Sequence, residues 1–349
     1  MRILLIHNPN AGDRKHSKKE LMSSLRKCRL QALYQSTKKR DWKKALKKRV
    51  DLVIAAGGDG TVQKTACEMM DSGIPLAILS LGTANNLARS LGFTAPVREI
   101  LQSLHCGKSR PFDLGLAPNA QQSRYFFEAA GGGLFVDYFP VAEATEKEGD
   151  SPEEKLTAHL SLLRELALDY PARHWKMSID GQDISGRYIL WGAMNIRSAG
   201  PGLHLAPKAK TDDGLLDFVA VREHEREIFI KHVDAHLPGR KGRVPLKPRK
   251  FRELVITSSS GAMHLDGKQW RGKKNNNSRR RDAVEITIKP AALMIWQADA
   301  VIRQKKSDNR GRKSPRKSWA GKGSNAYKLF ATCSPARQWM SWRCTSIRA

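Results

Sequence analysis

The stretch that decides the fold is VIAAGGDGT at residues 53–61, where a short apolar run passes directly into a glycine-rich loop. Small apolar residues bounded by polar turns are typical of a buried parallel strand. Three glycines within four residues remove side chains that would keep a ligand from the backbone, and a helical pattern begins at Val62. Because the start of a helix presents unpaired N–H groups, this stretch predicts a phosphate-binding turn.

Asp59 is the single carboxylate of this loop. Beside phosphate groups, a carboxylate is useful if it holds Mg²⁺ or accepts a proton. The alternative is a Gly-Asp-Gly turn in which Asp59 only caps the following helix.

A second loop of the same kind reads SLGTANNLAR at residues 80–89. Gly82 allows close approach of a ligand, and Thr83 offers a hydroxyl to phosphate. Asn85 or Asn86 can cap the next helix or bind a ligand. The loop therefore resembles the first one in its chemistry.

A third loop, NPNAG at residues 8–12, follows the apolar run at 2–7. Together with the runs at 51–56 and 75–80, this gives three predicted parallel strands that each end in a loop of small or polar residues. Carboxyl ends of parallel strands share one edge of a sheet, so the three loops should converge there.

The alternation of strands with helical patterns predicts an α/β domain with a parallel sheet. The helices are expected at residues 17–29 and 41–48, with Ser17 and Asp41 as N-caps. After about residue 122 the pattern changes to a mainly antiparallel β structure, interrupted by predicted helices. Its predicted strands are 125–130, 175–179, 188–195, 215–221, 254–257 and 284–288, and its predicted helices are 152–170 and 223–236.

The composition limits the classes of protein that fit. The 349 residues are enough for two domains, and no apolar stretch approaches the ~20 residues of a membrane-spanning helix. We expect a soluble cytoplasmic protein. Its five cysteines are scattered, without the spacing of a zinc site or a disulfide framework.

The net charge of +28 is uneven along the chain. Residues 303–349 contain 13 Lys and Arg and one acid, without a core-forming pattern, and we expect 301–349 to be a basic, disordered tail. The remaining excess lies mainly at 38–49, 240–250 and 271–281. These runs are either solvated surface or surfaces that attract nucleic acid or anionic lipid.

Other nucleotide-binding motifs are absent. The sequence has no GxxxxGK[ST] loop and no kinase H-R-D or D-F-G set. A P-loop protein and a protein kinase are therefore excluded by pattern.

The three loops together resemble the catalytic domain of the diacylglycerol kinase and sphingosine kinase family, especially its soluble bacterial lipid kinases. Three further segments support the resemblance, in the same order along the chain: RPFDLG at 110–115, PKAKTDDGLLD at 207–217 and LDG at 265–267. The resemblance covers about residues 1–300, which leaves the tail outside it.

This resemblance implies an α/β nucleotide domain at 1–122, completed by 289–300, and a β-sandwich lipid-substrate domain at 123–288. It implies transfer of a phosphoryl group from ATP, with Mg²⁺, to a diacylglycerol-like or sphingoid-like hydroxyl. The ATP-binding residues would be Thr37, Gly57, Gly58, Asp59, Gly60, Thr61, Val62, Gln63, Thr83 and Asn85.

The resemblance also implies a magnesium site that supports the second domain, held by Asp213 with the carbonyls of Lys210 and Leu215. The alternative for this segment is a β-turn with Asp-Gly at its corner. Both can hold at once.

One position departs from the family pattern. Where the family has Asp-Gly-Glu, with the Glu commonly taken as the base for the lipid hydroxyl, this chain has Asp266, Gly267 and Lys268. A lysine cannot accept that proton unless its pKa falls by several units. Three interpretations stay open: Asp266 or Asp59 acts as the base, Lys268 binds an anionic group, or the protein is a weak or inactive homologue.

Two rival functions share some of these features. NAD kinases also carry the GGDGT loop, whereas the segments at 8–12 and 212–217 favour a lipid acceptor. The charge alone suggests a nucleic-acid-binding protein, but no recognised nucleic-acid module is present and we expect no specific nucleic-acid partner. We expect peripheral association with the inner membrane face, and the sequence leaves a homodimer open.

Overall fold

The computed structural model describes residues 1–12, 16–82, 84–118, 125–145, 150–239, 246–259, 261–270 and 283–298. All of them belong to one compact unit, Met1–Ser307. Thr83 and the predicted tail at 301–349 lie outside the described residues.

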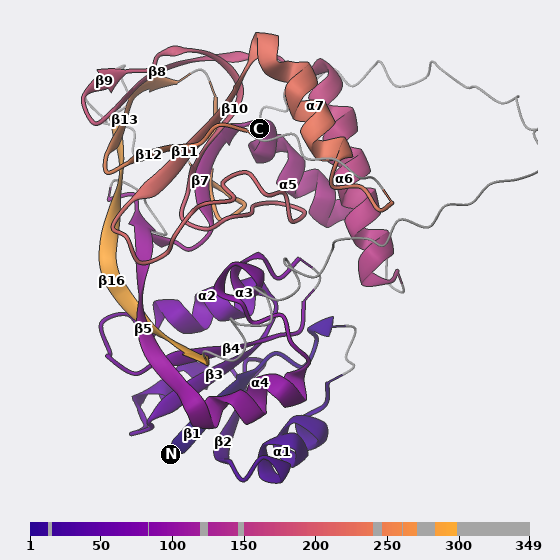
Figure 1. The fold of residues 1–349 in the computed structure, drawn as a ribbon, viewed down its shortest axis with the longest axis vertical. Helices are drawn as coiled ribbons and strands as arrows, with labels where there is room; N and C mark the ends of the chain where they lie inside the picture. Colours follow the sequence, from indigo (N-terminus) through magenta and orange to yellow (C-terminus); the bar gives the residue numbers. More distant parts are fainter. Residues whose placement is uncertain are drawn as a thin grey trace, which may run out of the picture. The chain divides into compact units, whose positions relative to one another are not determined.

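The first half of the chain is built on a parallel sheet with the strand order β4–β3–β1–β2 (Figure 1). Its strands are β1 (Arg2–His7), β2 (Gln31–Ser36), β3 (Leu52–Gly57) and β4 (Leu76–Ser80). Every residue of β3 is buried, as expected for a central strand covered on both faces.

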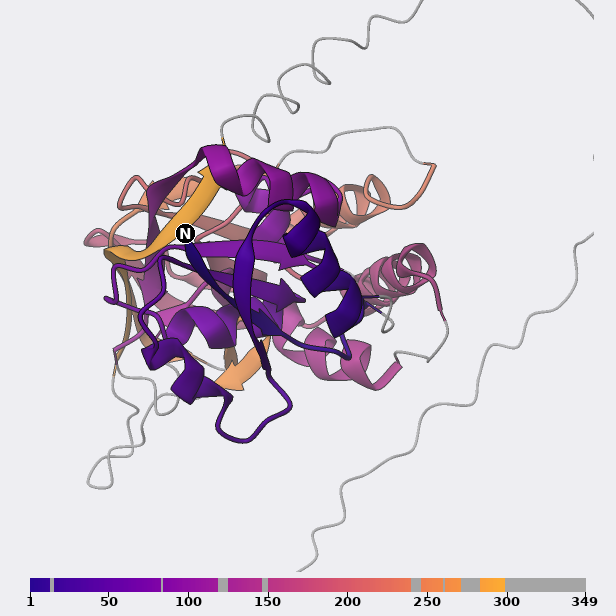
Figure 2. The same cartoon turned by 90° about the horizontal axis from the view of Figure 1, so that it is seen from below.

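Helices cover both faces of this sheet (Figure 2). Helix α1 packs against α4, while α2 packs against α3. Ser17 begins α1 with a capping box to Glu20. The elements are α1 (Lys18–Lys27), the 3₁₀ segment η2 (Trp42–Lys47), α2 (Asp59–Cys67), α3 (Asn86–Leu91), α4 (Val97–Ser103) and η3 (Leu104–Cys106).

Two long strands connect the two halves of the molecule: β5 (Gly107–Leu116) and β16 (Val284–Ala298), which pair antiparallel. β16 begins beside a strand of the second sheet and ends beside β4, where Ile295 pairs with Leu76. The chain therefore returns to the first sheet through β16 (Figure 1, yellow).

The second half is an antiparallel β structure. The central strand β10 (Gly186–Met194) pairs with three neighbours, β7, β8 and β11. The others are β6 (Tyr125–Phe126), β7 (Ala129–Gly133), β8 (Arg173–Ile179), β9 (Gln182–Asp183), β11 (Leu216–Arg222), β12 (Arg249–Phe251), β13 (Leu254–Ser259), β14 (Met263–Leu265) and β15 (Lys268–Trp270).

Helices α5 (Leu134–Thr145), α6 (Pro152–Asp169) and α7 (Arg226–Asp234), with the short segment η4 (Glu223–Glu225), accompany this sheet. They share a core with it that includes Phe135 and Phe229. Among the described residues, no helix combines the length and the apolar character needed to cross a membrane.

The predicted fold class is confirmed: an α/β nucleotide-type domain is followed by a mainly antiparallel β domain. Some elements differ in detail. The predicted helix at 41–48 is a 3₁₀ segment without a side-chain cap at Asp41. The predicted strand at 125–130 is two strands, β6 and β7, separated at Phe127 and Glu128. Helix α5, which is apolar on most sides, and the long strand β5 were not predicted.

Candidate active site

The three predicted loops meet at one edge of the parallel sheet. A Cβ atom on Gly82 would lie 2.7 Å from the Cα of Gly58, and one on Gly12 would lie 2.4 Å from the carbonyl oxygen of Leu81. These distances leave no room for side chains, so glycine is required where the loops touch. The convergence expected from the strand pattern is therefore present.

The GGDGT loop forms the start of helix α2, with Gly58 as its N-cap. A Cβ on Gly57 would meet the Thr61 side chain at 2.5 Å, whereas one on Gly60 would meet no atom within 4 Å. Gly60 thus leaves open space over the first turn of the helix, where N–H groups lack helical partners.

The other predicted ATP-binding residues divide into two groups. Thr61 and Val62 are buried, and the Thr61 hydroxyl accepts a hydrogen bond from Asn8 at 3.3 Å. Thr37 follows β2 at the same sheet edge, where its N–H donates to the carbonyl of His7 at 2.9 Å. Thr61 and Val62 support the loop, whereas Gly58 and Gly60 are accessible on it and Thr37 follows another strand of the same sheet.

Asn85 shapes the second loop. It has a left-handed φ of 49°, and its side chain pairs with Gly82 twice, accepting from the N–H at 3.0 Å and donating to the carbonyl at 2.5 Å. Asn86 instead points to the second half of the molecule. Its side-chain amide donates to Glu128 at 3.1 Å and to the carbonyl of Gly200 at 2.9 Å.

The Asp59 carboxylate joins the first two loops. Its oxygens accept the N–H groups of Asn86 at 2.9 Å and Leu87 at 3.2 Å, in the first turn of α3. Asp59 therefore caps a helix, but the next helix along the chain instead of the one that it begins. Burial raises the pKa of Asp59, against the lowering effects of these N–H groups and of Arg89.

Asp266 occupies the turn between β14 and β15, with a left-handed φ of 47°. Its two carboxylate oxygens accept three backbone N–H groups, from Phe127 at 2.8 Å, Glu128 at 2.8 Å and Ala129 at 3.1 Å. Asp266 thereby fixes the link between β6 and β7. Burial raises its pKa to about 6, although the N–H groups oppose the change.

Glu128, which the sequence analysis did not select, lies between these two acids. Its carboxylate accepts the side-chain amides of Gln63 at 3.2 Å and Asn86 at 3.1 Å. Burial raises its pKa well above the usual value, and the charges of Asp59 and Asp266 raise it further. The signal available in the sequence was a carboxylate within the apolar run 125–130, a position where a buried strand rarely carries one.

Lys268 is the second residue after Asp266 and opens β15, where it pairs with Leu265. Its side chain is exposed, and the described residues offer it no hydrogen bond or ion pair.

We name the group of Asp59, Glu128 and Asp266 the carboxylate cluster. The structure thus brings Asp59, Gln63 and Asp266 together around Glu128.

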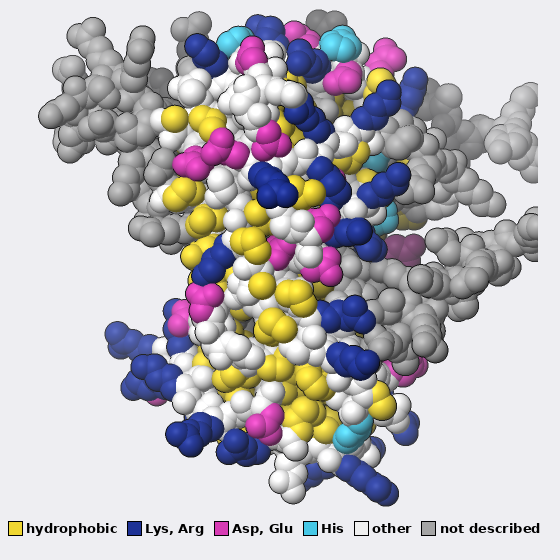
Figure 3. Space-filling model, turned by 60° about the vertical axis from the view of Figure 1, so that its left-hand side comes forward, with side chains coloured by type: hydrophobic (Ala, Val, Ile, Leu, Met, Phe, Trp, Pro, Cys, Tyr) yellow, Lys and Arg dark blue, Asp and Glu magenta, His cyan; other side chains and the backbone are white. Residues whose placement is uncertain are grey.

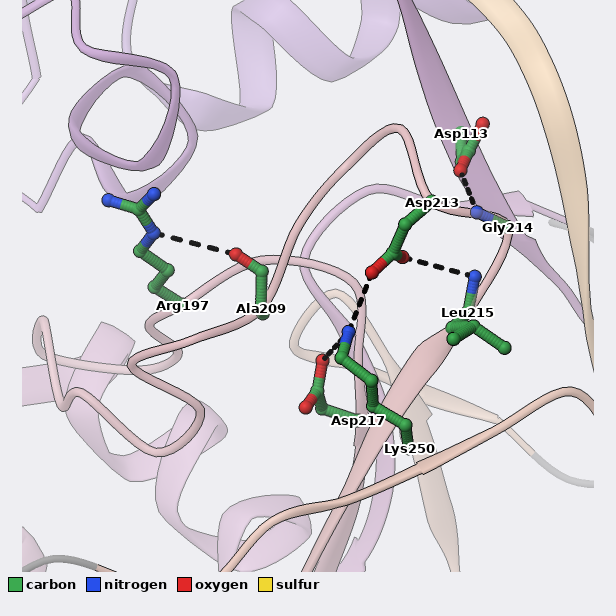
Figure 4. Close-up of polar contacts among 8 residues, drawn as sticks. All are labelled: Asp113, Arg197, Ala209, Asp213, Gly214, Leu215, Asp217 and Lys250. Carbon is green, nitrogen blue, oxygen red and sulfur yellow. Dashed lines mark hydrogen bonds and ion pairs between the residues drawn. The ribbon is translucent and has the colours of Figure 1, made fainter.

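The predicted metal residues lie at a different place, before β11 (Figure 4). The Asp213 carboxylate contacts the Lys250 ammonium at 2.7 Å and accepts the N–H of Leu215 at 3.3 Å. The Lys210 side chain is exposed. Within the described parts of the chain, no three or more His, Cys, Asp and Glu residues are grouped as metal ligands.

Comparison with known proteins agrees with an α/β domain followed by a β domain. Residues 2–117 match the diacylglycerol kinase catalytic domain, and residues 140–270 match the YegS C-terminal NAD kinase beta sandwich-like domain. A diacylglycerol kinase of Bacillus subtilis is 29% identical over 76% of this chain and 89% of its own. A probable lipid kinase YegS-like of Pseudomonas aeruginosa is 29% identical over 70% of this chain and 75% of its own.

Among solved structures, a putative diacylglycerol kinase from Bacillus anthracis has the same fold. It superposes with a TM-score of 0.64 at 21% identity, covering 86% of this chain and 97% of its own. Both domain matches occur in the expected order and cover most of the chain. The chain therefore belongs to the diacylglycerol kinase catalytic-domain family.

Proposed function

We propose that this protein is an ATP- and Mg²⁺-dependent lipid kinase that phosphorylates the hydroxyl of a diacylglycerol-like or sphingoid-like lipid. The observation that carries the proposal is the carboxylate cluster, which lies at the start of helix α2 and joins residues of both halves of the molecule. A phosphate donor on one side and an alcohol on the other would meet at such a position.

The phosphates of ATP fit the edge formed by the glycine loops. Gly58 and Gly60 leave the backbone accessible, and the helix dipole of α2 favours negative charge at its N-terminus. The described acids form no group of three that could hold a metal ion. We therefore propose that Mg²⁺ would enter the site with ATP, where it would neutralise charge on the phosphates.

Glu128 is the best candidate for the general base. Both oxygens of Asp59 and of Asp266 accept backbone N–H groups, which makes these two acids part of the framework. Among the described residues, the Glu128 carboxylate accepts hydrogen bonds from side-chain amides and from no backbone N–H group. A raised pKa also suits a group that must accept a proton near neutral pH.

This assignment explains how an enzyme can work with Lys268 in the Asp-Gly-x turn. The carboxylate is supplied from the link between β6 and β7, which Asp266 holds against that same turn. The Lys268 ammonium, exposed beside it, is then free to attract an anionic headgroup or phosphate.

We also propose that the protein meets its lipid at an anionic membrane surface. A surface hollow of about 560 Å³ between α1 and β2 is lined by Lys18, Lys19 and Arg26 around Met22, Leu30 and Ala32. Basic side chains around an apolar floor suit an anionic amphiphile. Lys and Arg also border a band of hydrophobic side chains on the face drawn in Figure 3.

Vesicle binding tests this membrane proposal. Binding should rise with anionic lipid content and weaken with salt, and the pair Lys19→Glu and Arg26→Glu should reduce it. Lys47→Glu, an exposed basic residue of η2 outside the hollow, is the matched control. Equal binding to neutral and anionic vesicles would refute the proposal.

A labelled-ATP assay tests the function itself. The full-length protein is incubated with Mg²⁺, labelled ATP and mixed micelles of diacylglycerol, sphingoid base, alkylglycerol or phosphatidylglycerol, with NAD as a separate acceptor. We expect one labelled lipid class and no labelled NADP. Labelling of NAD alone would identify a nucleotide kinase, and no labelled product with any acceptor would contradict the assignment of an active kinase.

A further inference from the structure

The acidic turn at residues 207–217 is where the family resemblance implies a divalent cation, and the structure allows the fit of that cation to be examined. The expected ligands are the Asp213 carboxylate and the carbonyls of Lys210 and Leu215. A hard divalent cation prefers several free oxygen ligands, commonly including carboxylates. The state of the Asp213 carboxylate therefore decides whether the site suits a metal.

Both oxygens of Asp213 already have partners. Oδ2 lies 2.7 Å from the Lys250 ammonium, and Oδ1 accepts the N–H of Leu215 at 3.3 Å. The carboxylate is thus neutralised and oriented by the protein itself. A metal at the same carboxylate would have to displace the ammonium.

Lys250 also reaches a second acid. Its ammonium lies 3.5 Å from Oδ2 of Asp217, whose side chain is only 5% exposed. The contact is built into the sheet, because Asp217 on β11 and Lys250 on β12 are direct partners in the antiparallel register. Figure 4 shows the Lys250 amine between the two carboxylates.

We propose that the Lys250 ammonium takes the place of a divalent cation in this turn. An ammonium is a compact charge with three donors, so it can bridge two carboxylates as a metal would. The sequence in this region therefore keeps the acids of a metal-type turn and supplies the positive charge from the neighbouring strand.

The turn held in this way is connected to both long strands between the halves. Asp113 of β5 accepts the N–H of Gly214 at 2.8 Å and the N–H of Ala291 of β16 at 2.8 Å. The Lys250 bridge thus keeps the turn in the shape that Asp113 requires. Its loss should lower the stability of the folded chain, whatever the activity of the enzyme.

Thermal unfolding of the full-length protein tests the proposal, without nucleotide, in EDTA and in millimolar Mg²⁺. Four variants are compared with the wild type: Lys250→Met, Asp213→Asn, the double variant Lys250→Met/Asp213→Asn, and Arg249→Met as the matched control. Arg249 is the neighbour of Lys250 on β12, but its guanidinium donates to Gln182 and contacts neither acid.

In the wild type and in Arg249→Met, we expect Mg²⁺ to cause no rise in Tm that Asp213→Asn would remove. Lys250→Met should melt about 3–8 °C lower in EDTA, because two acids lose their counterion. Mg²⁺ should restore part of that loss, and Asp213→Asn in the same chain should abolish the restoration. If Lys250→Met does not fold in EDTA, folding on addition of Mg²⁺ is the expected result.

Two results would overturn the proposal. One is a rise of the wild-type Tm with Mg²⁺ that Asp213→Asn alone removes, since a metal would then bind despite Lys250. The other is a Lys250→Met protein with the wild-type Tm in EDTA and no response to Mg²⁺. Both results are independent of phosphoryl transfer, so they leave the kinase assignment untouched.

Discussion

The molecule contains two groups of neighbouring acids, and they differ in what lies between the carboxylates. In the turn before β11, the Lys250 ammonium lies between Asp213 and Asp217. In the carboxylate cluster, the described residues that donate to the Glu128 carboxylate are two side-chain amides, while burial and the neighbouring acids raise its pKa. Burial and nearby like charges favour the protonated form of a carboxyl group.

This difference separates a structural site from a reactive one. A neutralised pair of acids holds a turn in place and has little affinity for further charge. In the carboxylate cluster burial and like charges favour bound protons, against the opposing effect of Arg89 on Asp59, and such a group is suited to accept a proton from a substrate. In our proposals, Lys250 therefore stabilises the turn before β11, and Glu128 takes part in the reaction.

The largest effect should come from Glu128→Gln. If Glu128 accepts the proton of the lipid hydroxyl, this change should lower kcat by about 10²–10⁴-fold, the range of general-base contributions. The affinity for ATP should change little, because the glycine loops are untouched. Turnover and nucleotide binding are measured together, with Glu99→Gln on the exposed face of α4 as a control. Wild-type turnover in Glu128→Gln would remove the contrast between the two groups.

Substitutions at the glycines of the phosphate-binding edge should change ATP binding or stability. Gly58→Val should weaken ATP binding by about tenfold or more, equivalent to about 1.4 kcal/mol. The fold has room for a Cβ there, since it would lie 3.5 Å from the Cα of Gly82. Gly82→Ala would instead bring a Cβ within 2.7 Å of Gly58 and should lower Tm. Titration with ATP and thermal unfolding distinguish the two; unchanged ATP affinity in Gly58→Val would place the nucleotide elsewhere.

Asp59→Asn should remove most of the turnover while keeping the fold. The asparagine side chain retains an oxygen that can accept one N–H at the start of α3, but it lacks the charge next to the phosphates. Circular dichroism and turnover measure the two effects separately. An Asp59→Asn protein with full activity would make this acid a helix cap and nothing more.

The smallest effect is on stability as a function of pH. A buried carboxylate whose folded pKa is raised stabilises the fold only while protonated, and this contribution is lost as pH rises through the folded pKa. For Asp266, the loss falls between its unfolded value of 3.8 and about 6. Glu128 should behave in the same direction.

The Tm of Glu128→Gln relative to wild type should therefore increase as pH rises from about 4 towards neutrality. At low pH the two proteins should approach each other, because the wild-type carboxyl is then neutral too. The difference in Tm across this pH range is the measurement. A difference in Tm that does not change with pH would show that ionisation of Glu128 does not destabilise the fold.

The parallel sheet and its loops were predictable from sequence because each strand is a short apolar run followed by glycine, and period and glycine position are local signals. Strand β3, with its exit into Gly57 and Gly58, is the clearest example. The edge strand β2 was missed because its residues are only partly buried, which weakens the apolar signal.

Glu128 was missed for a physical reason. Its position depends on contacts with residues 42 and 65 positions away along the chain, Asn86 and Gln63, which no local pattern reveals. Lys250 is similar, since the register of β11 and β12 places it beside Asp217, from where its ammonium also reaches Asp213 in the turn before β11. Sequence patterns selected Asp59, Asp213 and Asp266 but not Glu128, and they did not show which acids have partners.

The most direct test of Glu128 as the general base transfers the carboxylate from residue 128 to residue 268. Lipid phosphorylation is measured in Glu128→Gln and in the same variant carrying Lys268→Glu, with Lys268→Glu alone as the reference. If the base comes from the link between β6 and β7, Glu128→Gln loses turnover and Lys268→Glu in that background restores part of it, since the turn at Asp266 brings both positions to the same edge. A rise in turnover from Lys268→Glu alone, with no loss in Glu128→Gln, would contradict the account and place the base position at residue 268.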